Sequence, residues 1–393
     1  MTQLKIPAVY MRGGTSKGVF FRADALPADP RQRERILLRV IGSPDPYGKQ
    51  IDGMGGATSS TSKVALVSRS KRPDCDVDYL FGAVPIAGAR IDWSGNCGNL
   101  SAAVGPFAIA EGLVDAAPDG VAVVRIWQAN IGKRIVAHVP MRGGEVVEDG
   151  DFELDGVTFP AAEIRLDFLD PGGAHDGAPG GAMFPTGRPS DTLAIAGVGS
   201  YEVTYIDAGN PAIFIDARAL GLSGAELQAD VNGNAQLLEL CEAIRAHGAV
   251  AMGLAATPRE ATALRPHTPK LAFVAAPLGY TSSAGRLVLK EEIDLNARIL
   301  SMGQLHHAMT GTGAVAIAAA AAIPGTLPRR LLGERAGGDI RFGHPSGTLR
   351  VGAAACQTDG AWRVTKVTMS RSARRLMEGW VRVPRGAADQ PPD

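Results

Sequence analysis

Short runs of alternating apolar and polar residues, separated by glycine-rich turns, dominate the chain. Near the N-terminus, residues 5–11, 19–21 and 64–68 show the alternation expected of strands with one buried face. Residues 30–42 instead carry apolar side chains at helical spacing, with arginines and a glutamate on the opposite side. This pattern predicts a protein built mostly of strands, with an amphipathic surface helix close to its start.

The same pattern continues along the rest of the chain. We expect further strands within residues 76–86, 121–128, 134–141, 201–209, 212–217, 271–277, 341–353 and 362–370. A helix is expected to carry both Leu227 and Ile244 on one face. Residues 370–384 are expected to cross back to the first half of the chain, and the glycine- and proline-rich residues 170–181 predict a long loop near a domain boundary.

Two stretches differ because they carry almost no charge. Residues 91–114 begin with three residues that resemble the end of a strand, turn at 94–96, and continue as a small-residue helix from Leu100 to about Glu111. Residues 301–322 repeat this layout, with a glycine-rich corner followed by an alanine-rich helix. Helices with so few charges are expected to be buried on most faces. Each half therefore has strands, a glycine-rich corner and one buried helix, which predicts a duplicated α+β architecture.

Cys97 lies directly before the first of these helices. The unpaired N–H groups and the positive dipole end of a helix N-terminus favour a thiolate and can also seat a carboxylate. The alternative is a buried structural cysteine, and the flanking glycine and asparagine residues leave the two interpretations evenly balanced. If two helix N-termini face one cleft, they can hold a substrate with several carboxylates.

Two other loops combine glycines with hydroxyl and cationic side chains. Residues 12–18 hold three glycines, two hydroxyls and two cations, a set that can surround an anion, although the spacing is not that of a phosphate-binding loop. Residues 50–63 contain only Asp52 and Lys63 as charged groups. A lysine partly removed from water has a lowered pKa and can act as a base. A solvated lysine at a strand end is the alternative, and the residues alone favour it.

Composition and charge exclude several classes of function. Lys plus Arg and Asp plus Glu number 40 each, and no basic tail or stripe suggests a nucleic-acid partner. The N-terminal residues lack the apolar core of a signal peptide, and the longest apolar run, 314–323, is too short for a bilayer. The four cysteines are widely spaced, which predicts neither a disulfide framework nor a zinc site and favours the cytoplasm. His306 and His307 lack a further ligand pair, so hydrogen-bonding histidines are favoured over metal ligands.

The motifs at these positions resemble a known group of enzymes. Residues 97–99 before an alanine-rich helix are similar to the first half-site of the diaminopimelate epimerase-like superfamily, and residues 209–211 and 310–313 are similar to its second half. The resemblance is closer to the PrpF family, the 2-methylaconitate cis-trans isomerases of the methylcitrate cycle. It is carried, in order and over nearly the whole length, by MRGGTSKGVFFR (11–22), IGSPDPYGKQIDGMGGATSSTSK (41–63), DVDYLFG (76–82), DWSGNCGNLSAAVGPFAI (92–109), SMGQLHHAM (301–309), IPGTL (323–327), RFGHPSGTLRVGA (341–353) and MSRSARRLMEGWVRVP (369–384).

The resemblance implies an α+β fold with two similar domains, each a β-barrel-like sheet around a central helix, and an active site between them. The implied boundaries are residues 1–188 together with 376–393 for the N-terminal domain and 189–375 for the C-terminal domain. The glycine-rich residues 172–181 are then expected to act as a hinge for closure. The resemblance also implies a reaction that needs no metal, pyridoxal phosphate or nicotinamide.

The implied activity converts 2-methyl-trans-aconitate to 2-methyl-cis-aconitate by allylic proton abstraction, in propionate catabolism. The family's general base matches Lys63, with Cys97 nearby as the second catalytic residue. The position of the second cysteine in related racemases is Thr310 here, which argues against a two-thiol mechanism. The residues expected to bind substrate are Arg12, Ser16, Lys17, Ser62, Asn96, Gly98, Asn99, Asn210, Lys270, His306, Met309, Gly311, Thr312, Gly313 and Ser346.

Two alternatives remain open. The first is a related isomerase such as a 4-oxalomesaconate tautomerase or a methylitaconate isomerase. The second is a non-catalytic accessory protein for an iron–sulfur 2-methylcitrate dehydratase, although no cysteine spacing suits a cluster. The expected partners are a small tricarboxylate and, through function, that dehydratase. A homo-oligomer is left open, and neither nucleic acid nor a membrane is expected.

Overall fold

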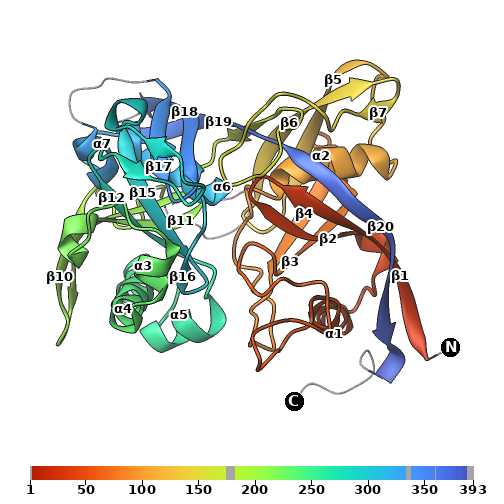
Figure 1. Ribbon diagram of the computed structural model, residues 1–393, viewed down its shortest axis with the longest axis horizontal. Coiled ribbons are helices and arrows are strands. Elements are labelled where there is room, and N and C mark those ends of the chain that lie inside the picture. The colour runs from red at the N-terminus through yellow and green to blue at the C-terminus, as the bar shows by residue number, and fades with distance from the viewer. Residues whose placement is uncertain (1, 174–181, 333–337, 359, 387–393) are drawn as a thin grey trace.

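The computed structural model describes residues 2–173, 182–332, 338–358 and 360–386, which form a mixed sheet with a few helices, an α+β fold. Figure 1 shows two halves side by side, with α1 and α2 in one half and α3, α4, α5 and α7 in the other. We call residues 2–169 together with β20 the first half, and residues 182–371 the second half. The expected hinge at 172–181 lies almost entirely outside the described residues.

The strands of the first half pair in the order of the sequence. β1 is antiparallel to β2, β2 parallel to β3, β3 antiparallel to β4, β4 parallel to β5, and β5 antiparallel to β6. β6 also pairs with β7 and β8, and β20 returns to pair with β1 along its whole length. The bounds are β1 (Gln3–Gly13), β2 (Ser16–Arg22), β3 (Lys63–Arg69), β4 (Val77–Ala83), β5 (Gly120–Gln128), β6 (Lys133–Arg142), β7 (Glu145–Val146), β8 (Ile164–Leu169) and β20 (Ala373–Pro384).

The second half repeats this alternation of strand directions. β10 is antiparallel to β11, β11 parallel to β12, β12 antiparallel to β15, β15 parallel to β17, and β17 antiparallel to β18. β19 pairs with β18 on one side and with β8 on the other, so it joins the halves. The bounds are β9 (Asp191–Ile195), β10 (Gly199–Ala208), β11 (Asn210–Asp216), β12 (Lys270–Ala275), β13 (Tyr280–Thr281), β14 (Leu287–Val288), β15 (Leu295–Ser301), β16 (Gln304–Leu305), β17 (Ile340–His344), β18 (Gly347–Thr358) and β19 (Ala361–Arg371).

One buried helix packs inside the strands of each half. In the first half α2 (Ser101–Ala110) contacts β1, β3, β5, β6 and β8, and residues 101–108 are buried. In the second half α6 (Gly311–Ala321) contacts β10, β11, β18 and β19, and all of its residues are buried. Burial on every face explains why both helices lack charge and consist of small residues that allow strands to approach closely.

The remaining helices lie outside the strands, and one of the predictions for them is wrong. α1 (Pro30–Ile41) begins at the Asp29 cap, whose carboxylate accepts from two backbone N–H groups. The single helix predicted to carry Leu227 and Ile244 is two helices, α3 (Gln228–Asn232) and α4 (Ala235–Ala251). The break arises because the Asn234 side chain caps α4 by accepting from the Leu237 N–H. α5 (Pro258–Leu264) and α7 (Leu327–Leu331) are short.

Most predicted strands are confirmed, with one correction in the central stretch. Residues 91–93 do not end a strand, because only Asp92 forms an isolated bridge, to Ala83. The return of residues 370–384 to the first half is confirmed by the pairing of β20 with β1. The structure also contains β8, β9 and β15, three strands that the sequence pattern did not predict. Among the described residues, no helix has both the length and the apolar character needed to cross a membrane.

Candidate active site

The N-termini of the two buried helices lie against each other at the boundary between the halves. A Cβ atom on Gly98, just before α2, would lie 2.7 Å from the carbonyl carbon of Gly311, the first residue of α6. A Cβ atom on Gly311 would in turn overlap the backbone of Gly98. Glycine at both positions therefore allows the positive ends of two helix dipoles to meet.

Several backbone N–H groups at this junction are available to an anion. Within the described part of the chain, the N–H groups of residues 97–100 and 311–312 have no protein acceptor. The Gly313 N–H is different, because the Thr310 hydroxyl caps α6 by accepting from it at 3.1 Å. The prediction that the Gly313 N–H binds substrate therefore does not fit the structure. Gly98, Asn99, Gly311 and Thr312 retain the N–H groups that seat carboxylates at helix N-termini.

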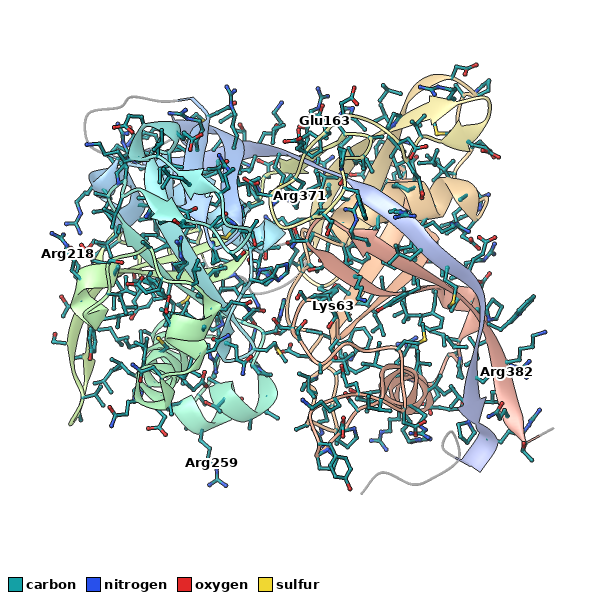
Figure 2. The ribbon with its side chains drawn as sticks, in the orientation of Figure 1. Lys63, Glu163, Arg218, Arg259, Arg371 and Arg382 are labelled. Carbon is teal, nitrogen blue, oxygen red and sulfur yellow. The ribbon has the colours of Figure 1, made fainter. Side chains whose placement is uncertain are left out.

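Lys63 is buried near this junction and opens β3. Its exposed fraction is 5%, and its Nζ lies 5.0 Å from the ring centroid of Phe81. Figure 2 shows Lys63 near the middle of the molecule, where the two halves meet. Burial lowers the pKa of Lys63, and the charge of a Cys97 thiolate acts in the opposite direction. The alternative of a solvated lysine at a strand end is therefore wrong, and Lys63 has the environment of an amine base.

Cys97 is also buried and belongs to the core that surrounds α2. Its carbonyl accepts from the Ser101 N–H and hydroxyl, which fixes the first turn of the helix. The cysteine is thus both a core residue and a neighbour of Lys63, so the two interpretations of Cys97 do not exclude each other.

A second buried lysine, Lys270, opens β12 in the other half. Its Nζ donates to Ser301 Oγ at 2.9 Å and lies 3.1 Å from His267 Nδ1. Burial and the nearby Lys63 charge lower the pKa of Lys270 to about 7. His267 Nε2 lies 3.2 Å from the Asn96 carbonyl oxygen, and burial together with both lysines holds the pKa of His267 well below its usual value. A neutral imidazole with its proton on Nε2 satisfies both contacts.

Asn99, a predicted binding residue, connects the halves. Asn99 Nδ2 donates to Thr15 Oγ1 at 2.9 Å and lies within 3.3 Å of the Met309 carbonyl and 3.4 Å of Ser16 Oγ. Asn99 Oδ1 accepts from Arg371 Nε at 3.2 Å. Burial lowers the pKa of Arg371 to about 10. Asn99 thus gathers residues from both halves beside the start of α2.

His306 and His307 are not arranged as metal ligands. Their rings stack with centroids 4.7 Å apart, and His306 Nδ1 accepts from the Ala308 N–H at 3.1 Å. Burial, followed by the His307, Lys63 and Lys270 charges, holds the pKa of His306 well below its usual value. No three histidine, cysteine, aspartate or glutamate side chains within the described ranges come close enough together to hold a metal ion.

Other predicted binding residues hold loops. The Arg12 guanidinium donates to the Gly14 carbonyl at 3.2 Å and to the carbonyl and hydroxyl of Ser372 at 3.0 and 3.1 Å. Ser62 Oγ donates to the Val84 carbonyl at 2.7 Å, and Ser346 Oγ donates to the His307 carbonyl at 2.6 Å. These contacts hold the loops around the site, and the role of the three side chains in substrate binding stays a prediction.

A cavity of about 540 Å³ lies beside these loops. Its walls come from both halves and include Arg12, Ser16, Lys17, Ser60 and His307. Ser60 Oγ and His307 Nδ1, both in its wall, are 3.4 Å apart. Ser60 and Thr61 in its wall belong to the loop that leads into β3, the strand that begins with Lys63.

Three further polar residues of this region, beyond those predicted from the sequence, are His267, Ser301 and Arg371. His267 lies in a turn before β12 and outside every motif, so only the packing of distant segments brings it to the site. Ser301 ends β15 and opens the stretch 301–309, which carries the family resemblance. Arg371 lies in the stretch 369–384 that carries the family resemblance, which was the available signal.

Comparison with known proteins identifies the relatives of this chain. The family model described as PrpF protein matches residues 3–384. Two 2-methyl-aconitate isomerases, from Cupriavidus necator and Shewanella oneidensis, are each 60% identical to it, covering 97% and 98% of this chain and 98% of each relative. The crystal structure of a methylitaconate-delta-isomerase is 39% identical, covers 99% of this chain and 98% of that chain, and superposes with a TM-score of 0.75.

Proposed function

Because this chain belongs to the PrpF family and is an isomerase, we propose that it converts 2-methyl-trans-aconitate to 2-methyl-cis-aconitate in the methylcitrate cycle. The 60% identity to 2-methyl-aconitate isomerases over almost the full length supports this substrate. The observation that carries the proposal is the buried amine of Lys63 beside two helix N-termini with available N–H groups. That combination provides a base together with sites for several carboxylates.

We further propose that the two halves are similar domains, each a β-barrel-like sheet around its buried helix, divided at residues 1–188 with 376–393 and 189–375. The identical alternation of strand directions from β1 to β6 and from β10 to β18 supports this division. The location of α2 and α6 after corresponding strands supports it as well.

The proposed reaction begins with proton removal at the substrate's methylene group, which lies next to both the double bond and a carboxylate. Neutral Lys63 takes this proton, so the C–H bond breaks and an N–H bond forms. The electron pair spreads over the former double bond and the adjacent carboxylate. The weakened double bond can then rotate, and return of the proton gives the other geometric isomer. Burial of Lys63 favours its neutral form and so provides the base.

The negative charge that develops on the carboxylates is held by the surrounding protein. The N–H groups of Gly98, Asn99, Gly311 and Thr312 lie at two helix N-termini, where such charge is stabilised. Cys97, beside Lys63, either returns the proton or polarises the substrate. We propose that Ser16, Lys17, Asn96, Asn210, Lys270, His306 and Met309 complete the binding site, while Arg12, Ser62 and Ser346 position its loops.

We propose that the isomerase works without a metal or organic cofactor, because its own amine and N–H groups provide the base and the charge stabilisation. We also propose a cytoplasmic location and a functional link to the iron–sulfur 2-methylcitrate dehydratase. The four cysteines, which are all free thiols, suit a reducing compartment.

The test is turnover of 2-methyl-trans-aconitate by the purified protein in deuterated water, with no partner present. We expect deuterium incorporation and trans-to-cis conversion, both reduced by about 10²–10⁴-fold in Lys63→Met, the range for removal of a general base. Lys290→Met, at an exposed lysine, is the matched control. Absence of turnover by the wild type would exclude this substrate.

A second candidate substrate is methylitaconate, which the 39% identity to a methylitaconate-delta-isomerase of known structure favours. The same assay with methylitaconate distinguishes the two, because the better substrate has the higher kcat/KM. Turnover only in the presence of a dehydratase would instead support the accessory role.

A further inference from the structure

Lys63 and Lys270 occupy equivalent positions in the two halves. The third residue of β2, Gly18, lies beside Lys63 at the start of β3, and these strands are parallel. The third residue of β11, Ala212, pairs with Lys270 at the start of β12, and these strands are also parallel. Each lysine therefore opens the third strand of the repeated arrangement, at the same register.

The two lysines also point in equivalent directions. Side chains alternate along a strand, so Lys63 shares a face with Ala65 and Val67, which belong to the core around α2 and α6. Lys270 in the same way shares a face with Ala272 and Val274, which belong to that same core. Each amine thus lies on the helix-facing side of its sheet. Both amines are close enough to influence His267 and His306.

The amine of Lys270 is held in a fixed direction. The register of β12 and β15 continues to Lys270 and Ser301, which explains why Ser301 Oγ lies 2.9 Å from Nζ. His267 Nδ1 is the second partner, at 3.1 Å, and the His267 backbone N–H donates to Asp92 Oδ2 at 2.8 Å. An ammonium group has three N–H donors, and these two acceptors use two of them. The third remains for a ligand.

We propose that Lys270 is a second catalytic amine, whose ammonium binds the substrate carboxylate that takes up charge when Lys63 removes the allylic proton. His267 and Ser301 are the positioning residues that direct it. This inference rests on the proposed function. When Lys63 forms its new N–H bond, the electron pair from the broken C–H bond moves through the double bond onto the carboxylate oxygens. Lys270 keeps its protons throughout, and proton return from Lys63 reverses the shift.

Charged groups of both signs surround Lys270. The titratable and charged groups that act on or contact it are Lys63, Asp92, Cys97, Arg245, His267 and His306. Burial and the Lys63 charge lower the pKa of Lys270 to about 7, against the opposing effect of Asp92 and Cys97. Two buried ammonium groups repel each other, so one amine is readily neutral while the other carries the charge. An incoming tricarboxylate favours the charged form of Lys270.

The experiment compares Lys270→Met, which removes the charge, with Lys270→Arg, which keeps it. We expect kcat/KM to fall by about 10²–10³-fold in Lys270→Met, as for loss of a group that stabilises developing charge. Lys270→Arg should recover at least tenfold of this loss. In the wild type, kcat/KM should decline as the pH rises through about 7, because Lys270 loses its proton there. The arginine variant should lack this decline, which a merely structural lysine would not explain.

Two results would overturn the inference. The first is a Lys270→Met enzyme within threefold of wild type with an unchanged pH profile. The second is equal inactivity of Lys270→Met and Lys270→Arg with unchanged thermal unfolding. The positive charge that arginine keeps would then not contribute to the reaction. If the wild type prefers methylitaconate, the proposed substrate fails, but the Lys270 comparison is carried out with methylitaconate and decides this inference independently.

The positioning role of His267 has its own test. His267→Gln keeps an acceptor for Nζ, whereas His267→Leu does not. We expect the glutamine variant to keep more of kcat/KM than the leucine variant. We also expect the alkaline decline to begin at lower pH in His267→Leu, because loss of an acceptor disfavours the charged amine. Identical pH profiles in the two variants and the wild type would contradict a role through Lys270.

Discussion

The side chain of Asn210 pairs with the backbone of Asn96 through two hydrogen bonds. Asn210 Oδ1 accepts from the Asn96 N–H at 2.8 Å, and Asn210 Nδ2 donates to the Asn96 carbonyl at 2.9 Å. Asn210 Nδ2 also lies 3.1 Å from Thr312 Oγ1, at the start of α6. One carboxamide from the second half therefore fixes the turn that leads to Cys97 in the first half.

The substitution Asn210→Asp tests how much the hydrogen bonds between Asn210 and Asn96 contribute to stability. The substitution keeps the shape but removes both Nδ2 donors and places a carboxylate oxygen against the Asn96 carbonyl. We expect a loss of about 3 kcal/mol in the free energy of unfolding, the order expected for unsatisfied buried groups. Urea unfolding measures it. An unchanged midpoint and unchanged kcat/KM would show that the halves are held together elsewhere.

Gly98→Ala tests the contact between the two helix N-termini. The new Cβ would lie 2.7 Å from the Gly311 carbonyl carbon, so α2 and α6 must move apart by several tenths of an ångström. In the proposed site the N–H groups on both sides seat the carboxylates. We therefore expect KM to rise and kcat to fall together, by at least tenfold in kcat/KM. Gly386→Ala, whose Cβ meets open space, is the control. Wild-type kinetics for Gly98→Ala would contradict this geometry.

Stability should fall as the medium becomes acidic, because several buried histidines are neutral in the folded protein. Burial lowers the pKa of His344 to about 3, against an ordinary value of 6.5. The unfolded chain therefore binds more protons below pH 6.5, and the contribution of His344 is lost as pH falls from 6.5 toward 3. The loss amounts to about 1.4 kcal/mol per pH unit for one such histidine. Asp207 acts in the opposite direction, because burial raises its pKa to about 6.

The measurement is urea unfolding at pH 7.5 and at pH 5.5, for the wild type and for His344→Gln. We expect the wild type to lose more stability than the variant over this interval, by about 1 kcal/mol. Equal losses would show that His344 does not remain neutral in the folded protein.

Local patterns in the sequence predict most strands and both buried helices, because alternation and the absence of charge depend only on near neighbours. The small residues ahead of α2 indicate a functional corner at its N-terminus. Lys63 is predicted as a catalytic residue only through the family resemblance. The contact of Ser301 with Lys270 could not be predicted, because the pairing of β12 with β15 brings them together, and His267 lies outside every motif. Burial of Lys63 depends on the same long-range packing.

Lys63→Met should make the protein more stable while it removes activity. Lys63 is buried at 5% exposure, and its Nζ packs over the Phe81 ring. Burying an amine there costs the free energy of its hydration in water. A methionine of similar length has no such hydration to lose. We expect the free energy of unfolding to increase by about 1–3 kcal/mol.

Thermal and urea unfolding measure the change. The control Lys290→Met, at the protein surface, should leave the free energy of unfolding within 0.5 kcal/mol of the wild type (about the usual spread for surface substitutions). A destabilised Lys63→Met protein would mean that the amine has a partner that stabilises the fold. A stabilised and inactive protein would mean that the lysine is kept at this position for its chemistry.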